Sequence, residues 1–273
     1  MTDTPDFLTR IIAQKRVRLA HAMSSQSCAE EVREEALRVR STARPHALRA
    51  ALAGERGFHI IAEIKRASPS LGDIRPDLAP ADIARRYEAA GAAAISVLTE
   101  EDHFKGSLED LREVRAATSL PLLRKDFIFD EWQLYEAAAA RADALLLIVA
   151  ALDDAMLARL RRIAEDELGM DALVEVHTRE ELRRADVCGA SVIGVNNRNL
   201  HTFAVSLDTS VELVEHAPPG ALLVSESGLG THADLRRLKS LGYRGFLVGE
   251  TLMRAADPAA ALRALSSEER RDA

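Results

Sequence analysis

Eight short apolar runs recur along this chain, and a segment with helical periodicity follows each of them. The runs lie at residues 58–65, 94–98, 121–125, 144–150, 172–176, 191–196, 221–225 and 245–248. Short runs that are apolar on both faces are typical of buried parallel strands, which helices cover on the outside. An open doubly wound sheet usually stops at about five or six strands, so eight units predict an α/β fold, a closed (β/α)8 TIM barrel.

About fifty residues precede the first run and stand outside the repeat. Apolar residues at helical spacing predict one helix over residues 7–24 and a second, charged helix over residues 30–43. We therefore expect a single barrel domain over residues 1–273, with residues 1–50 as an N-terminal helical extension. This extension could cap the mouth of the barrel or pack against its side, and the sequence leaves both arrangements open.

Composition limits the kinds of partner that the protein can bind and the compartment in which we expect it. The net charge of -7 at pH 7 argues against a general nucleic-acid binder, whose surface would be basic. No run approaches the roughly 20 apolar residues of a membrane span, and Asp3, Pro5 and Asp6 stand where a signal peptide would be basic and then apolar. Cys28 and Cys188 lack the paired spacing of a zinc or redox motif. We expect a cytoplasmic protein with two free thiols.

Charged side chains stand at the carboxyl ends of the predicted strands. Glu63 and Lys65 close the first run, Lys125 closes the third, and Glu175 lies in the fifth. Because side chains alternate along a strand, Glu63 and Lys65 share one face. An isolated pair of this kind is more often a structural ion pair. However, the active site of a TIM barrel lies at this end, and four charged groups around one mouth favour proton-transfer chemistry.

The later strand ends carry polar residues and glycines, namely Asn196, Arg198, Glu226, Ser227, Gly228, Gly249 and Glu250. The loops after the last two strands commonly bind phosphate in TIM barrels, where backbone N–H groups contact the anion and glycine allows a close approach. Two ordinary tight turns are the alternative. Together with the lysines and carboxylates, these loops predict a sugar phosphate as the class of substrate.

Eight segments, in order and at the spacing of the barrel strands, together resemble the indole-3-glycerol phosphate synthase family. They are residues 62–70 (AEIKRASPS), 95–99 (ISVLT), 104–108 (FKGSL), 123–128 (LRKDFI), 174–177 (VEVH), 194–200 (GVNNRNL), 225–228 (SESG) and 248–253 (VGETLM). The resemblance covers nearly the whole chain. It implies a TIM barrel and a carbon–carbon lyase of tryptophan biosynthesis.

The resemblance also implies the reaction. The substrate would be 1-(2-carboxyphenylamino)-1-deoxyribulose 5-phosphate, which closes to indole-3-glycerol phosphate with loss of carbon dioxide and water. The ring carbon that bears the carboxylate attacks the ketone, so an acid must assist the ketone oxygen. By analogy with the family, Lys125 is that general acid. Glu175 would serve one step of the later dehydration, and Lys65 with Glu63 would assist the other. Lys65 could instead hold the carboxylate or the phosphate.

The same resemblance implies a set of substrate-binding residues. Ser68, Phe104 and Asn196 would position the substrate, and Arg198 would hold the carboxylate of the anthranilate ring with its planar guanidinium. The phosphate-binding residues implied are Ser227, Gly228, Gly249 and Glu250. For Glu250 only the backbone N–H suits this role, because its carboxylate would repel a phosphate.

No metal-ligand spacing is visible among the histidines, and we expect neither a metal nor another cofactor. The expected partner is the small-molecule substrate, bound by a monomer without nucleic acid, membrane or an obligatory protein partner. Leu71 stands where many relatives carry a basic residue, which leaves that loop without its usual cation. Two alternatives remain, a phosphoribosylanthranilate isomerase and a catalytically silent barrel that binds a phosphate ligand or a protein.

Overall fold

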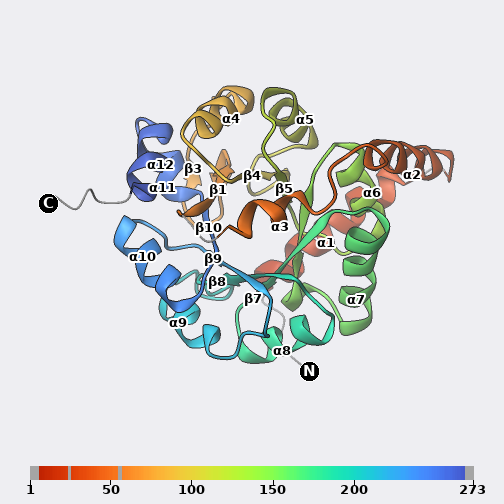
Figure 1. Cartoon of the computed structure of the whole chain (residues 1–273). Coiled ribbons are helices and arrows are strands. Elements are labelled where there is room, and N and C mark those ends of the chain that lie inside the picture. The colour runs from red at the N-terminus through yellow and green to blue at the C-terminus, as the bar shows by residue number, and fades with distance from the viewer. Residues whose placement is uncertain (1–5, 24–25, 55–56, 268–273) are drawn as a thin grey trace, which may run out of the picture.

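The computed structural model describes residues 6–23, 26–54 and 57–267 of the 273-residue chain. Eight parallel strands close a barrel in the order β1-β10-β9-β8-β7-β6-β5-β4, and helices surround it (Figure 1). The strands are β1 (His59–Ile64), β4 (Ala94–Leu98), β5 (Leu122–Lys125), β6 (Ala144–Ile148), β7 (Asp171–Val176), β8 (Val192–Asn196), β9 (Leu222–Glu226) and β10 (Gly245–Val248). The predicted (β/α)8 TIM barrel is thereby confirmed.

A main helix follows each barrel strand and runs back along the outside of the barrel. These helices are α4 (Pro80–Ala89), α5 (Leu108–Ala117), α6 (Glu131–Ala139), α7 (Asp154–Arg162), α8 (Arg179–Val187), α9 (Asp208–Val214), α10 (His232–Leu241) and α12 (Pro258–Ser266). Several begin at a residue whose side chain accepts a backbone N–H of the first turn, namely Ser107, Asp130, Asp153, Thr178, Thr231 and Asp257. Such caps satisfy N–H groups that the helix itself leaves unpaired, so they fix where each helix starts.

Shorter elements interrupt this regular pattern. A small antiparallel hairpin, β2 (Ala67–Ser68) and β3 (Gly72–Asp73), lies in the loop after β1, and the short helix α11 (Glu250–Arg254) follows β10. A 3-10 turn, η1 (Val149–Ala151), follows β6, and a π-helical turn, η2 (Ile163–Glu167), extends α7. The hairpin and α11 both stand at the mouth of the barrel.

The N-terminal extension forms three helices, which are α1 (Asp6–Ala22), α2 (Gln26–Arg40) and α3 (Ala47–Leu52). The first two correspond to the predicted helices, although residue 24, where the first was expected to end, lies outside the described residues. Helix α2 packs against α6, and α3 crosses the barrel near its axis (Figure 1). Leu48 and Leu52 of α3 are fully buried against the residues that fill the barrel. Helix α3 therefore forms the floor of the barrel, opposite the mouth.

The two faces of β1 show how the strands divide their side chains. Ile60, Ala62 and Ile64 pack outward into the layer between strands and helices, whereas Ile61 packs inward with the residues that fill the barrel. The period of two continues along the strand, so Glu63 also points inward, one layer nearer the mouth. This alternation is the one that the sequence predicts for the face that carries Glu63 and Lys65.

The length of the helices and the state of the cysteines concern the environment of the protein. Within the described ranges, no helix has the length and apolar character required to span a bilayer. Cys188 carries a free thiol, and burial raises the pKa of that thiol above its ordinary value. The side chain of Cys28 lies outside what the structure describes.

Candidate active site

A cavity of about 610 Å³ opens at the carboxyl ends of the barrel strands. All twelve site residues expected from the sequence line it, namely Glu63, Lys65, Ser68, Phe104, Lys125, Glu175, Asn196, Arg198, Ser227, Gly228, Gly249 and Glu250. They come from β1, β2, β5, β7, β8 and α11 and from the loops after β1, β4, β8, β9 and β10. The barrel thus gathers at one place side chains that are up to 187 positions apart, from Glu63 to Glu250.

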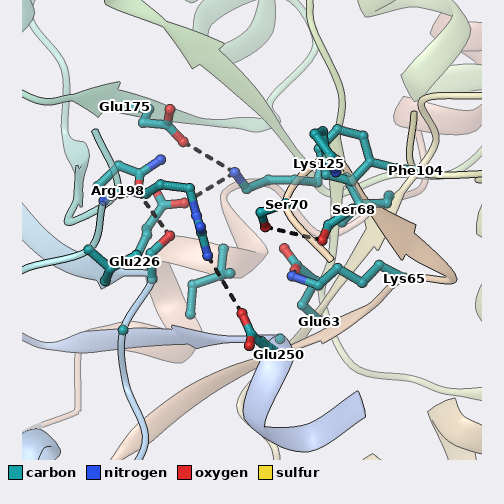
Figure 2. Close-up of a pocket in the computed structure, with 18 of the residues that line it drawn as sticks. Glu63, Lys65, Ser68, Ser70, Phe104, Lys125, Glu175, Arg198, Glu226 and Glu250 are labelled. Atoms are coloured by element: carbon teal, nitrogen blue, oxygen red, sulfur yellow. Dashed lines mark hydrogen bonds and ion pairs between the residues drawn. The ribbon is translucent and has the colours of Figure 1, made fainter. Parts of the chain in front are cut away.

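The ammonium group of Lys125 lies between two carboxylates on the floor of this cavity. Its Nζ atom is 3.2 Å from Glu175 Oε2 and 3.2 Å from Glu226 Oε2. Figure 2 shows Lys125 reaching across the cavity toward both groups. Glu175 and Glu226 are 2% and 1% exposed, so the three charges interact with little screening by water.

Burial and charge act in opposite directions on these groups. Burial alone would lower the pKa of Lys125, but the carboxylates of Glu226, Glu175 and Glu63 outweigh it and raise that pKa. For Glu175, burial is outweighed by Lys125 and His177, which hold the pKa of this carboxyl below its usual range. Burial raises the pKa of Glu226 to about 7, against the opposing effect of Lys125. Two neighbouring carboxyls therefore differ in their proton affinity, as an acid–base site requires.

Glu226 stands at the end of its strand, where the sequence alone gives it no role. Its inward direction follows from the period of two, because Val224 packs inside the barrel two residues earlier. Its closeness to Lys125 does not follow from the sequence, because β5 and β9 are not neighbours in the barrel. Gly194 of β8 makes room for this side chain, since a Cβ atom there would lie 2.0 Å from Glu226 Oε1.

Glu63 and Lys65 form a second ion pair on the other side of the cavity (Figure 2). Lys65 Nζ lies 2.7 Å from Glu63 Oε1, and both side chains are largely buried. Gly249 approaches this pair so closely that a Cβ atom there would lie 2.1 Å from Glu63 Oε1 and 3.0 Å from Lys65 Nζ. The glycine expected for phosphate contact is thus also required by the packing of the pair.

The loop after β1 is fastened to the loop after β4. Arg66 forms an ion pair with Asp110 at the start of α5, and Lys105 Nζ lies 2.6 Å from Asp73 Oδ1. The backbone N–H of Ala67 donates to the carbonyl of Phe104. These contacts hold Ser68 and Phe104 at the same side of the mouth. The lysine that pairs with Asp73 comes from a neighbouring loop, whereas Leu71 in the hairpin itself is exposed.

Polar contacts join the ends of β8 and β9. The Oγ–H of Ser227 donates to Asn196 Oδ1, which also accepts the backbone N–H of Arg198. Ser227 and Gly228 both have positive φ, at 67° and 77°, so the loop after β9 turns sharply at the cavity. Successive N–H groups in such turns form concave anion-binding sites.

Arg198 reaches across the mouth toward Glu250 (Figure 2). Its Nη2 atom lies 3.6 Å from Glu250 Oε2, and its Nη1–H donates to the carbonyl of Phe203. The other carboxylate oxygen of Glu250 is 3.4 Å from Arg254. The Glu250 carboxylate is therefore balanced by two guanidinium groups, a contact that the sequence did not predict.

Helix α1 of the extension lies at the mouth, where Phe7 and Leu8 line the cavity. Lys15 of the same helix reaches the barrel, and its Nζ atom is 2.6 Å from Asp126 Oδ1, next in sequence to Lys125. Both arrangements open for the extension are present, because α1 borders the mouth and α2 packs against the side of the barrel at α6, while α3 closes the floor.

Among the residues that the structure describes, no three His, Cys, Asp or Glu side chains are grouped so that they could hold a metal ion. The charges of the cavity are instead arranged as lysine–carboxylate pairs within hydrogen-bond distance. A closed barrel with such groups at the carboxyl ends of its strands defines the class of (β/α)8-barrel enzymes.

Comparison with known proteins identifies the family within this class. The family model for indole-3-glycerol phosphate synthase matches residues 8–265. The relative from Rhizorhabdus wittichii is 49% identical over 261 residues, which cover 94% of this chain and 97% of that protein. The relative from Polaromonas sp. is 48% identical, with 94% and 97% covered, and both are called indole-3-glycerol phosphate synthase. The chain belongs to the indole-3-glycerol phosphate synthase family.

A more distant likeness concerns the fold alone. The solved thiamine phosphate pyrophosphorylase from Pyrococcus furiosus matches with a TM-score of 0.56 and 19% identity, covering 76% of this chain and 92% of that chain. It shares the barrel architecture. The family membership sets aside both the isomerase and the silent barrel as alternatives.

Proposed function

We propose that this cavity binds 1-(2-carboxyphenylamino)-1-deoxyribulose 5-phosphate and closes it to indole-3-glycerol phosphate, with loss of carbon dioxide and water. This activity would make the protein a carboxy-lyase of tryptophan biosynthesis. Membership of the indole-3-glycerol phosphate synthase family over residues 8–265 supports the proposal. The observation that carries it is the position of Lys125, whose ammonium group lies between two buried carboxylates on the cavity floor.

The lining of the cavity matches the two ends of this substrate. Phe104 and Phe127, whose ring centroids are 6.3 Å apart, offer an apolar wall for the aromatic ring. Ser227 and Gly228 provide backbone N–H groups in a sharp turn for the phosphate, and Gly249 provides one at the start of α11. Arg198 is placed to contact either anion at the mouth, and Ser68 and Asn196 would orient the sugar chain between them.

The first chemical step forms a carbon–carbon bond. The ring carbon that bears the carboxylate attacks the ketone carbon, and the ketone oxygen gains a proton as its double bond opens. In our proposal Lys125 donates that proton, because it is held protonated by its neighbours and lines the cavity floor. Release of carbon dioxide then returns the electrons of the carboxylate bond to the ring and restores its aromaticity.

Dehydration completes the indole. A base removes a proton from the carbon between the ring nitrogen and the new carbon–carbon bond, while an acid protonates the departing hydroxyl. Glu175 suits the base because its low pKa keeps it ionised. Lys65, which is paired with Glu63, then assists departure of the hydroxyl as water. Glu226 is the second carboxylate beside the Lys125 ammonium, a role that the sequence alone did not indicate.

We also propose an oligomeric state, a domain organisation and a location for the enzyme. It would act as a monomeric, single-domain barrel in the cytoplasm, and the sugar phosphate would be its partner. In this scheme the extension belongs to the working unit, because Phe7 and Leu8 line the cavity.

The test mixes the purified protein with the carboxyphenylamino-deoxyribulose phosphate and follows the fluorescence of the indole product. Lys125→Met keeps the length of the side chain and removes its proton, and we expect kcat to fall by about a hundredfold or more, the scale of a positioned general acid. Lys239→Met is the matched control, because Lys239 contacts Phe58 and Gly57 at the start of β1, away from the mouth. A folded wild type without product would refute the function, and full activity of Lys125→Met would refute the assigned role.

A further inference from the structure

A histidine stands directly behind Glu175, outside the cavity. His177 follows β7, and its Nε2 atom lies 3.5 Å from Glu175 Oε1. On the other side of the ring, Nδ1 lies 3.0 Å from Glu181 Oε2, and the same oxygen accepts the backbone N–H of His177 at 2.7 Å. Glu181 is itself placed by the first turn of α8, whose capping residue Thr178 accepts its backbone N–H. The imidazole is thus fixed between two carboxylates.

Carboxylates on both sides of the ring favour a proton on both nitrogens: Nδ1 is within hydrogen-bond distance of Glu181, and the buried Nε2 has no hydrogen-bond partner but lies within ion-pair distance of Glu175. A neutral imidazole has one N–H and one lone pair, so one of the two carboxylates would face a lone pair. A doubly protonated ring offers an N–H to each. The charged groups around the ring are Glu175 on β7, Glu181 on α8 and Glu226 on β9, with Lys125 of β5 beyond Glu175. Burial would lower the pKa of His177, but Glu181 and Glu175 outweigh it and raise this pKa.

We propose that His177 is a positioning residue, which stays doubly protonated between Glu181 and Glu175 and keeps Glu175 aligned and ionised for the reaction. The inference rests on the proposed function of the site. His177 does not line the cavity, so it acts through Glu175 and not on the substrate.

The proton transfer proposed for Lys125 leaves Glu175 with one cation fewer. Before the reaction, Glu175 lies between two cations, with Lys125 at 3.2 Å and His177 at 3.5 Å. Once Lys125 has given its proton to the ketone oxygen, it no longer balances the charge of Glu175, and Glu226 remains near. The imidazolium of His177 is then the cation that still stabilises the carboxylate. Glu175 consequently stays a base for the dehydration that follows.

The first test is the pH dependence of kcat. His177→Gln removes the positive charge but can still donate one hydrogen bond, so the pKa of Glu175 should rise. We expect the acid limb of the kcat profile to move up by about one pH unit, the lower end of the shifts that an opposite charge within about 4–6 Å produces. His216→Gln is the matched control, because His216 is exposed at the end of α9. An unchanged acid limb in a folded His177→Gln variant would overturn the inference.

The second test does not depend on activity. Nitrogen NMR of the histidine rings in the wild type should show His177 with both nitrogens protonated at pH 7.5, and Glu181→Gln should lower the pH at which this ring loses a proton. A neutral His177 ring at pH 7.5 in the wild type would overturn the inference. If the wild type forms no product, the proposed function fails, and the NMR result alone then decides whether His177 is charged.

Discussion

Gly194→Ala is the perturbation that most sharply tests how the cavity holds its charges. The added Cβ atom would lie 2.0 Å from Glu226 Oε1 and 3.2 Å from Leu173 Cδ1. An ordinary contact begins near 3.4 Å, so the carboxylate must move by about 1.4 Å. A movement of this size disturbs the ion pair in which Glu226 Oε2 lies 3.2 Å from Lys125 Nζ. The substitution therefore acts on Lys125 although it removes no charged group.

Gly194→Ala should change both the catalytic rate and the stability of the fold. Displacements of about 1 Å at a reacting group can cost about a hundredfold in rate, so we expect kcat to fall by about ten- to a hundredfold. Overpacking costs about 1–3 kcal/mol, and the loss of glycine freedom in the unfolded chain returns about 0.4–1 kcal/mol. The net destabilisation should therefore stay within about 3 kcal/mol, so the variant remains folded.

The assay measures kcat by product fluorescence and stability by thermal unfolding, with Glu226→Asp as a second-site change. Aspartate is one carbon shorter and leaves room for the alanine, so the double variant Gly194→Ala/Glu226→Asp should recover part of the activity that Gly194→Ala loses. Full activity of Gly194→Ala, or no recovery in the double variant, would show that Gly194 does not position Glu226.

Two further predictions concern the charges of the mouth. Burial raises the pKa of Glu226 from 4.5 to about 7, so this group takes up a proton on folding, and its contribution to stability falls as the pH rises between those values. Glu226→Gln should therefore raise the Tm by a few degrees at pH 8 and by less at pH 5. An equal rise in Tm at both pH values would contradict the pKa shift. Glu250→Gln frees Arg198 for a substrate anion and should lower KM by about two- to fivefold, the scale of an exposed ion pair. The decrease in KM should be smaller at high salt, which screens such pairs. An unchanged KM at low salt would contradict this role of Glu250.

The positions of the proposed catalytic side chains could be predicted because a strand has a period of two and a TIM barrel has one functional end. From Ile61 packing inward, Glu63 must also point inward, and the structure places it there. The same reasoning reaches Lys125 and Glu175 at their strand ends. These predictions depend on local sequence and on a rule of the fold, and they require no knowledge of distances.

The partners of these side chains could not be predicted in the same way. Glu226 meets Lys125 across the barrel, and Arg198 meets Glu250 across the mouth, so each contact depends on how the barrel closes. Gly194 lies within a strand, where nothing in the sequence indicates that its missing side chain makes room for Glu226. Helix α3 could not be predicted because it has only six residues, and its position depends on packing against the bottom of the barrel.

The floor formed by α3 also has a consequence for the order in which the fold is completed. Leu52 of α3 lies against Gly245, where a Cβ atom would be 3.3 Å from Leu52 Cδ2. The neighbouring strand β1 pairs with β10, so His59 meets the same glycine. On the ribosome these early residues emerge about 190 positions before their partner. The floor and the β1–β10 seam of the barrel therefore both depend on long-range contacts to the same glycine, which are the kind of contact that slows folding.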